Sequence, residues 1–525
     1  MTTQNISRKI RYKTAKRFKE SFVEDSELNV GYVTLGKSLP YEDENNPDLL
    51  IDSVSEEKDV WNNMFGAKKI VPGDVELVIK RYQWTTDTRY KQYDDTQTLE
   101  FLLSETIDGE DVVYPMFVIN SEGNVYKCLC NNISSFSTIE PTGDYSENNG
   151  FISTTDEGGD TCYLWKYMYN IRQSNKFLTN EWMPVPTTIN SLNAVEYSLD
   201  ESNFIDGGLN KIIVTNRGSG YVHSTLVIPQ FLEGQTTLTL PTTENVVENM
   251  LISGTGIFSG TFITSVSVEL SRITISTPTI SSGGGASNPV TIKTRVVVEG
   301  DGTGVTTDVR LIGDQIEKID ITSTGVDYTV AEVIIYGSGQ DAVARSVLPP
   351  KYGHGYNPAN ELGATNVMIS QRIGEVDSTE GGLIPVGNSF RQYSLLLNPH
   401  KYNDSIPVSG ITAESVISQT LDVTLLAGDE YPLNSFVYQG PENKPTFFGY
   451  VNNQDSQTVR LTNTFGQITI GTLLYSTDSP VTRPVASVSF PKLESYTGDI
   501  IYTKNVTAVE RTQGQSEEIK FVIQF

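Results

Sequence analysis

One of the three histidines has the surroundings of a catalytic loop. His354 stands between two glycines in PPKYGHGYNPANELGA (Pro349 to Ala364), a segment that predicts a loop followed by a short helix. A histidine in an exposed loop can transfer protons. The sequence contains no G-x-S-x-G, and no serine or cysteine nucleophile motif accompanies His354. We therefore expect this loop to pack on a partner rather than to catalyse a reaction.

The three cysteines predict neither disulfides nor a metal site. Cys128 and Cys130 are two positions apart in VYKCLC, so a strand would place both on one face, and Cys162 stands alone. So sparse a set is typical of a protein that folds in a reducing compartment. A metal site would need more ligands near them than the sequence offers. We expect buried thiols, no metal and no cofactor.

Acidic pairs such as Asp94-Asp95 and Glu517-Glu518 leave one enzyme class open. A glycosidase needs two carboxyl groups about 5–10 Å apart across a groove, which is a property of the fold. The sequence has no H-E-x-x-H, no C-x-x-C pair, no Walker loop and no G-x-G-x-x-G between a strand and a helix. We predict that the protein is not an enzyme, and the alternative is a carbohydrate-binding or carbohydrate-cleaving protein.

The densest group of unusual residues runs from Trp61 to Tyr90. The spacing of Trp61, Met64 and Phe65 is that of the apolar face of a short helix, and the alternation over residues 75–79 predicts a strand. Large rings are rarely left bare, and an arginine fork can brace loops. The stretch therefore predicts a rigid corner that positions its neighbours, with a binding surface as the alternative. The candidates for core and dimer contacts are Trp61, Trp84, Asp87, Arg89, Tyr90, Phe390 and Arg391.

Several motifs follow one another in a fixed order. The stretch from Trp61 to Tyr90 contains W-x-x-M-x-G, K-x-x-P, R-x-x-W and D-T-R-Y. VTLGKSLPY (Val33 to Tyr41) precedes it, and FRQYSLLLNP (Phe390 to Pro399) and the tail 498–525 come after it. This ordered set resembles the dimeric baseplate wedge protein of T-even-type contractile-tailed phages. The matches cover residues 1–190, a middle piece and the C-terminal tail.

The resemblance implies a β-sandwich core with flanking helices, a homodimer, and contacts to other baseplate wedge proteins. Tail-fibre-attachment proteins are further candidate partners. It implies a mechanical role, in which the subunit passes a change of baseplate shape from fibre attachment toward the sheath. The protein would be found in the virion, in the tail baseplate, after assembly in the host bacterial cytoplasm. A bacterial surface adhesin is a weaker alternative, because no signal peptide is visible.

The bulk composition agrees with a β-rich protein that avoids nucleic acid and membrane. The 525 residues include 43 glycines and 26 tyrosines, and only 19% are charged. With 38 Lys+Arg against 64 Asp+Glu, the formal net charge is -26, which repels polyphosphate. No apolar run reaches the roughly 18 residues that cross a bilayer. We therefore expect no nucleic-acid partner and no membrane insertion.

The N-terminal segment 8–19, RKIRYKTAKRFK, carries only positive charges. Ile10, Ala15 and Phe18 could line one side of a helix. Two interpretations stay open at this point. The segment is either a solvated surface helix or an arm that docks onto an acidic partner or onto the acidic body of a dimer mate.

Alternating apolar residues separated by turn signals predict a mainly β fold. The expected architecture is a multi-layer β-sandwich core with a few short helices and two inserted small β-domains. Strands are expected at residues 31–35, 99–105, 112–120, 124–130, 161–171, 366–373, 390–399 and 517–525.

An internal repeat marks the first inserted domain. LNKIIVTNRGSGY (Leu209 to Tyr221) aligns without gaps to IEKIDITSTGVDY (Ile316 to Tyr328). In each copy the glycine is expected to take a turn, with the tyrosine packed back over it. Residues 410–490 have short strands at turn-punctuated spacing and predict a small barrel or sandwich. The expected parts are 1–206, 207–350, 351–408, 409–492 and 493–525, of which the second and fourth are insertions into the wedge core.

Overall fold

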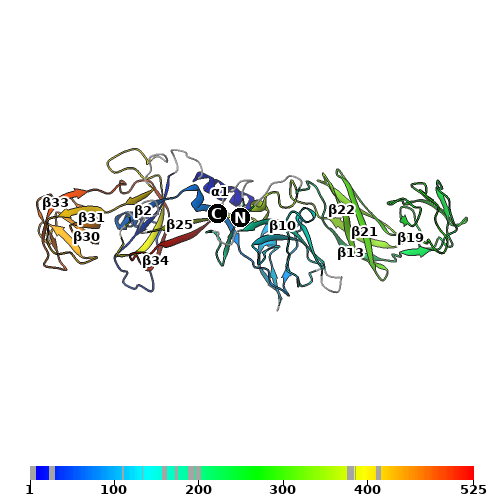
Figure 1. Cartoon of the computed structure of the whole chain (residues 1–525), viewed down its shortest axis with the longest axis horizontal. Coiled ribbons are helices and arrows are strands. Elements are labelled where there is room, and N and C mark those ends of the chain that lie inside the picture. The colour runs from blue at the N-terminus through cyan, green and yellow to red at the C-terminus, as the bar shows by residue number, and fades with distance from the viewer. Residues whose placement is uncertain are drawn as a thin grey trace, which may run out of the picture. The chain divides into compact units, whose positions relative to one another are not determined.

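The fold is described from a computed structural model (Figure 1). It describes residues 7–22, 30–108, 111–132, 134–155, 162–171, 176–186, 195–196, 203–374, 384, 386–408 and 415–525. Two predictions fall partly outside these residues: Thr161, at the start of an expected strand, and residues 409–414, at the start of the second expected insertion. The side chain of Cys162 is not described either. The chain divides into two compact units, residues 1–78 with 364–525 and residues 79–363.

The first unit brings N-terminal and C-terminal strands into shared sheets. One antiparallel sheet has the order β27-β2-β1-β26-β34, and in a second sheet β25 pairs with both β3 and β35. The two sheets contact each other where the ring of Phe521 stacks on that of Tyr502, with centroids 5.2 Å apart. The elements are α1 (Arg8–Ser21), β1 (Gly31–Gly36), α2 (Val54–Asn63), β2 (Met64–Lys69), β3 (Val75–Lys80), β25 (Asn366–Ile373), β26 (Ser389–Leu397), β27 (Val416–Ser418), β34 (Asp499–Glu510) and β35 (Glu517–Gln524).

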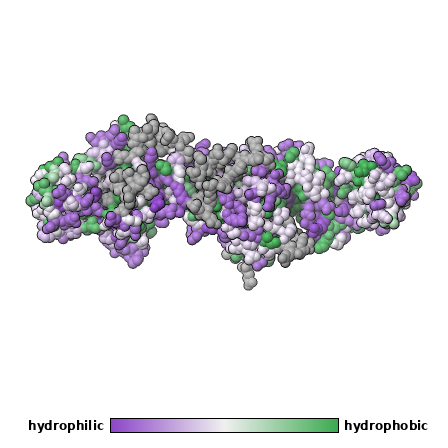
Figure 2. Space-filling view, in the orientation of Figure 1, coloured by the Kyte–Doolittle hydropathy of each residue, from purple (hydrophilic) through white to green (hydrophobic). Residues whose placement is uncertain are grey.

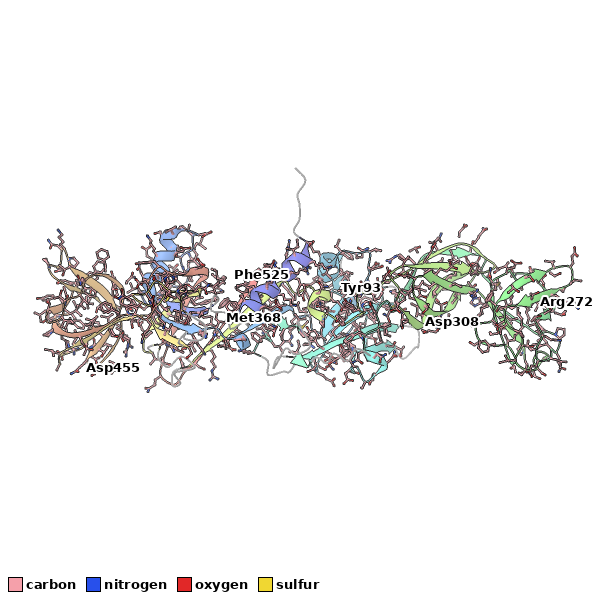
Figure 3. All side chains as sticks on the ribbon, turned by 90° about the horizontal axis from the view of Figure 1, so that it is seen from above. Tyr93, Arg272, Asp308, Met368, Asp455 and Phe525 are labelled. Atoms are coloured by element: carbon pink, nitrogen blue, oxygen red, sulfur yellow. The ribbon has the colours of Figure 1, made fainter. Side chains whose placement is uncertain are left out.

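The expected N-terminal helix is present and lies against the C-terminal strand. Tyr12, Ala15 and Lys19 are the buried residues of α1, whereas Ile10 points outward. Phe18 contacts Phe525 with ring centroids 5.1 Å apart, beside the position where Figures 1 and 3 place the C-terminus. Lys19 is paired with the buried Glu76 of β3, so a charged side chain, and not Ile10, completes the packed face.

A closed six-stranded barrel occupies residues 421–489 of the first unit. Its strand order is β28-β31-β30-β29-β32-β33, and apolar side chains fill its interior. Asp455 marks its β30–β31 hairpin in Figure 3. The strands are β28 (Leu421–Leu425), β29 (Phe436–Gln439), β30 (Phe447–Asp455), β31 (Thr458–Gly466), β32 (Leu473–Ser476) and β33 (Arg483–Ser489). Closure leaves the barrel without an exposed edge strand.

The second unit is built on a sheet with the order β12-β10-β8-β7, with β9 added on β10. Its aromatic core is formed largely by β10 and β8 and includes Trp165 and Tyr126. The elements outside residues 207–350 are β4 (Arg89–Tyr90), α3 (Leu99–Leu103), β5 (Thr106–Asp108), β6 (Asp111–Tyr114), β7 (Phe117–Ile119), β8 (Asn124–Cys130), β9 (Phe151–Thr155), β10 (Cys162–Ile171), β11 (Trp182–Pro184), β12 (Val195–Glu196) and α4 (Pro358–Glu361).

Residues 207–350 form two small β-structures, each with its own apolar core. The pairs β13–β24, β20–β23 and β21–β22 surround one core, and the three-stranded sheets β14-β19-β16 and β15-β18-β17 surround the other. The strands are β13 (Ile212–Ser219), β14 (Ser224–Leu226), β15 (Thr237–Thr239), β16 (Leu251–Ser253), β17 (Ile263–Ser267), β18 (Arg272–Ile275), β19 (Val290–Lys293), β20 (Arg295–Gly300), β21 (Thr303–Ile312), β22 (Gln315–Val326), β23 (Ala331–Tyr336) and β24 (Gln340–Ser346).

The two repeat copies exchange equivalent hydrogen bonds. Tyr221 donates its backbone N–H to the carbonyl of Asp314 at 2.9 Å, and Tyr328 donates to that of Gly207 at 3.3 Å. Gly207 and Asp314 each stand two residues ahead of the repeat copy that follows them. Each copy therefore contacts the other through matching positions, as in an internal two-fold pair.

The glycines of the repeat adopt the left-handed backbone, although they lie inside strands rather than at turns. Gly218 has φ 62° and Gly325 has φ 61°, and both tyrosine rings are buried as expected. A Cβ on Gly218 would lie 2.4 Å from the carbonyl oxygen of Gln340. Only glycine takes this conformation so close to other backbone without strain.

Gly218→Ala is therefore expected to lower the free energy of unfolding by about 1–3 kcal/mol from backbone strain, and by more where backbone must move. Gly313→Ala is the matched control, because Gly313 has φ 61° and a Cβ added there would meet nothing within 4 Å. Urea titrations of both variants measure the difference. Equal losses would show that the contact with Gln340 does not matter.

The mainly β fold class is confirmed, and three predictions of individual helices and strands are wrong. The segment 99–105, expected to be a strand, contains α3, because the side chain of Thr98 caps a helix by accepting from the N–H of Phe101 at 3.2 Å. The expected strand 112–120 is split into β6 and β7 around Pro115, which has no N–H to donate. Trp61, Met64 and Phe65 were expected on one face of a single helix. Only Trp61 belongs to α2, which ends at Asn63, whereas Met64 and Phe65 begin β2.

Candidate functional site

The candidate interface residues are divided between the two units. Trp61, Phe390 and Arg391 belong to the first unit, and the others belong to the second. Trp61 is only 5% exposed and packs in a core cluster with Tyr32 and Leu396. Phe390 is likewise buried. Both rings are therefore core residues and offer little surface that a partner could touch.

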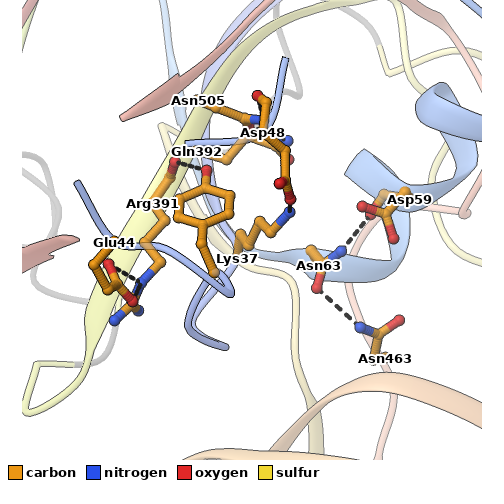
Figure 4. A network of polar contacts seen from close by, with 10 residues as sticks. Lys37, Glu44, Asp48, Asp59, Asn63, Arg391, Gln392, Asn463 and Asn505 are labelled. Atoms are coloured by element: carbon orange, nitrogen blue, oxygen red, sulfur yellow. Dashed lines mark hydrogen bonds and ion pairs between the residues drawn. The ribbon is translucent and has the colours of Figure 1, made fainter. Parts of the chain in front are cut away.

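Arg391 fixes the acidic loop after β1 (Figure 4). Its Nε donates to Glu44 at 2.8 Å, and its Nη1 donates to the carbonyl of Ser38 at 2.6 Å. Tyr41 donates its hydroxyl to the carbonyl of Arg391 at 2.8 Å. Burial, followed by the charge of Asp48, raises the pKa of Tyr41 to about 12. The guanidinium group of Arg391 thus joins two points of this loop, Ser38 and Glu44.

Arg391→Lys is expected to lower the free energy of unfolding of the first unit by about 1–2 kcal/mol, because an ammonium group cannot reproduce the fork that spans Glu44 and Ser38. Urea unfolding measures the loss. Arg272→Lys, at an exposed arginine, is the control and should change little. A loss no greater than that of the control would show that the fork is unnecessary.

Further polar contacts tie the same loop and α2 to other strands of the first unit. Lys37 pairs with Asp48 at 3.5 Å, and Asn505 of β34 donates to the carbonyl of Asp48 at 2.9 Å. Asn463 of β31 donates to the side-chain oxygen of Asn63 at 2.9 Å, which links the barrel to the end of α2 (Figure 4).

The remaining candidates surround the loop 134–138 of the second unit. Trp84 is half-buried and donates its indole N–H to Ser137 at 3.0 Å. Tyr90 is fully buried, with its ring edge-on to Trp165 at 5.5 Å. Arg89 lies over the ring of Phe136 at 4.4 Å, and Asp87 is exposed with φ 55°. Arg89, Asp87 and the outer part of Trp84 are therefore the candidates that a partner could touch.

His354 is not the exposed loop histidine that its flanking glycines suggested. It is 4% exposed, and its Nδ1 lies 3.0 Å from the Nζ of Lys127 on β8. Lys127 also donates to Glu361 at 2.7 Å, and the second oxygen of Glu361 accepts from the N–H of Gly355 at 2.8 Å. Burial, followed by the nearby lysines Lys127 and Lys166, holds the pKa of His354 well below its usual value, so that the ring is neutral. This group clamps the loop 349–363 onto the sheet of its own unit.

A second buried lysine lies directly across from the first. Lys166 of β10 faces Lys127 in the strand register, and both are fully buried. The ammonium group of Lys166 donates to the backbone carbonyls of Asn149 and Asn203 and lies 4.2 Å from the ring centre of Phe151. Burial lowers the pKa of Lys166 to about 7, which Glu361 offsets in part. Sequence inspection missed this cluster, because its members are scattered along the chain and belong to unrelated patterns.

The described residues offer no metal cluster, since no group of three or more His, Cys, Asp or Glu side chains is placed to hold an ion. Burial raises the pKa of Cys128 well above its usual value, which makes this thiol unreactive. Within the described part of the chain, no helix combines the length and the apolar character needed to cross a membrane. On the face shown in Figure 2, hydrophilic and hydrophobic residues are interspersed.

The second unit also contains a cavity of about 800 Å³. Amide side chains, including those of Asn131 and Asn149, line one part of it, and Ile213, Ile319 and Ile321 supply apolar surface. Its size is that of a small-molecule pocket, but it contains neither the buried histidine nor Lys127. The cavity borders the buried cluster, because Asn149 and Phe151, which contact Lys166, are among its lining residues.

Comparison with known proteins identifies what the N-terminal part of the chain resembles. The family model described as Bacteriophage T4, Gp8 matches residues 4–133. The baseplate wedge protein gp8 of Enterobacteria phage T4 is 26% identical over 207 residues, which cover 34% of this chain and 60% of the T4 protein. The chain thus spans about 60% of the length of the curated relative that it matches. The resemblance inferred from the ordered motifs, to a T4-like baseplate wedge subunit, is confirmed.

Proposed function

We propose that the protein is a non-enzymatic structural subunit of the baseplate wedge of a contractile phage tail. The observation that carries the proposal is the family match over residues 4–133, which includes the whole stretch from Trp61 to Tyr90. In that stretch, aromatic side chains such as Trp61 and Tyr90 brace packed elements. The cluster around His354 is closed and holds a loop, as a rigid structural body requires, rather than opening onto a substrate.

The partners that follow from this proposal are a second copy of the chain and the neighbouring wedge proteins, with tail-fibre-attachment proteins as further candidates. Half-buried Trp84, Arg89 and exposed Asp87 supply an interface around loop 134–138, and Arg391 supplies a second one by ordering the acidic loop. Trp61, Tyr90 and Phe390 contribute by keeping these surfaces rigid. Rigid β-bodies of this kind would pass a change of baseplate shape toward the sheath.

The location is tested on phage particles that contain the protein. Antibodies against the full chain are expected to label the tail baseplate in negatively stained particles after assembly in the host. Particles from a phage that lacks the gene should have no complete baseplate. Labelling of the capsid alone, or intact baseplates without the gene, would overturn the proposal.

The homodimer is tested on the purified chain at micromolar concentration. Light scattering is expected to give twice the chain mass of 57.9 kDa. Arg89→Glu should shift the mass toward that of one chain if the interface lies around loop 134–138, whereas Lys318→Glu, at a surface pair with Asp320, should not. A single-chain mass for the unaltered protein would contradict the dimer.

A further inference from the structure

The barrel carries aromatic rings on the outside of its wall, where an alternating strand would ordinarily place polar residues. In β29, Val437 points into the core, whereas Phe436 and Tyr438 flank it on the other face. The same holds for Phe448 in β30, whose neighbour Phe447 is a core residue. Five rings form the outer set, called here the aromatic row: Tyr475, Tyr438, Phe436, Phe448 and Phe465.

The five rings form a continuous series across four neighbouring strands. Taken in the order just given, successive ring centroids are 5.6, 6.0, 5.5 and 5.5 Å apart. The angles between successive ring planes are 28°, 27°, 31° and 26°. Phe436 and Tyr438 belong to one strand, β29, and the other three contacts join neighbouring strands, so the rings form one series across the wall. The row is thus an ordered feature of the barrel wall.

The row is open to solvent at one end. Phe465 is 69% exposed, and Phe436, Phe448 and Tyr475 are half-buried, whereas Tyr438 is only 9% exposed and backs the row from within the wall. None of the five residues is charged, in a chain whose net charge is -26. Large exposed apolar surface of this kind marks a site of interaction in a folded protein.

Three properties select the kind of ligand. The closed barrel offers no edge for the addition of a peptide strand. The row carries no lysine or arginine, so it has nothing to neutralise a polyanion, and the acidic chain repels one. A ligand that matches the row must be uncharged, extended, and built of repeating units with apolar faces and hydroxyl groups.

We propose that the aromatic row binds an uncharged polysaccharide chain. The C–H faces of successive sugar rings stack on the accessible aromatic rings of Phe465, Phe448, Phe436 and Tyr475, and the hydroxyl group of Tyr475 exchanges hydrogen bonds with sugar hydroxyls. Binding involves no bond cleavage, because the row supplies no carboxylate pair. The inference concerns the barrel alone and does not depend on the location of the protein in a baseplate.

The experiment is affinity gel electrophoresis of the full chain in gels containing dextran, laminarin or galactomannan, with alginate as the acidic comparison. We expect retardation by at least one neutral polysaccharide and none by alginate. Phe465→Ala should weaken the retardation about threefold to tenfold, the worth of one aromatic contact. Phe258→Ala, at a phenylalanine that is 54% exposed in the other unit, should leave it unchanged.

Each other outcome overturns the inference. These outcomes are no retardation by any of the three neutral polysaccharides, retardation by alginate only, and retardation that Phe465→Ala leaves intact. Thermal unfolding of Phe465→Ala should match that of the unaltered chain, since the ring is mostly exposed. Tyr475→Phe, which keeps the ring and removes one hydroxyl, should weaken binding less than Phe465→Ala does. A change of oligomeric state on Phe465→Ala without any sugar binding would identify the row as a protein interface instead.

Discussion

Replacing Lys127 by methionine is expected to destabilise the unit of residues 79–363 by about 3–5 kcal/mol, because the change leaves the charge of Glu361 buried without its partner. The side chains of Lys127 and Glu361 are 0% and 3% exposed, so water cannot replace the lost ammonium group. Glu361 would keep only the N–H groups of Gly355 and Asn357, at 2.8 and 3.3 Å. Loss of the clamp should release the loop that contains His354.

The double variant Lys127→Met with Glu361→Gln separates the charge from the packing. A neutral glutamine can still accept from Gly355 and carries no unpaired charge, so the double variant should recover much of the loss. Urea unfolding followed by the fluorescence of the buried Trp165 reports on this sheet. Lys318→Met is the control, because its surface pair with Asp320 should be worth less than about 1 kcal/mol. A Lys127→Met loss as small as the control would contradict the buried pair.

The strands that the sequence predicted correctly are those with a strong local pattern. β10 was expected from its run of aromatic residues, and β35 from its alternation, and both are present. α1 was expected because Ile10, Ala15 and Phe18 could line one side of a helix, although its buried residues include Lys19 and exclude Ile10. The segment that became α3 was misjudged because its apolar residues fit a strand as well as a helix. The helix is capped by the hydrogen bond that the Thr98 side chain accepts from the N–H of Phe101.

The candidate site could be predicted only in part, because its contacts join distant segments. Glu361 lies 234 positions from Lys127, and no spacing rule connects them. The glycines beside His354 suggested exposure, whereas they allow the backbone to approach the buried cluster, as at Gly355, where a Cβ would lie 3.3 Å from Lys166. The division into a core with two insertions stays a prediction, and so does the role of the candidate residues in a dimer.

The second prediction with a large effect concerns Lys166, whose stabilising contribution should depend on pH. Its neighbours are Lys127 directly across the strands, the backbone carbonyls of Asn149 and Asn203, and Glu361, whose charge acts on it more weakly than burial does. Burial therefore disfavours the charged form and lowers the pKa of Lys166 to about 7 in the folded protein.

The direction of this pH dependence follows from how many protons Lys166 binds in the folded and in the unfolded chain. Between about pH 7 and the unfolded pKa near 10.5, the unfolded chain holds a proton on Lys166 that the folded chain does not, so the free energy of unfolding rises with pH in this window. Below pH 7 both states are protonated and the destabilisation is present in full. A shift of this size corresponds to about 4–5 kcal/mol between the two limits.

Lys166→Met removes the titrating group and should abolish this dependence. Its free energy of unfolding, relative to that of the unaltered chain, is expected to fall steadily from pH 7 to pH 10, because only the unaltered chain gains stability over this window. The carbonyls of Asn149 and Asn203 lose their donor in the variant, which adds a constant offset without changing the slope. Urea unfolding at a series of pH values measures the difference, and Lys318→Met supplies the slope of an exposed lysine. The contrary result is a difference in the free energy of unfolding, between Lys166→Met and the unaltered chain, that stays constant from pH 7 to pH 10. It would show that the pKa of Lys166 is not lowered in the folded protein, because only a lowered pKa makes stability depend on this proton in that range.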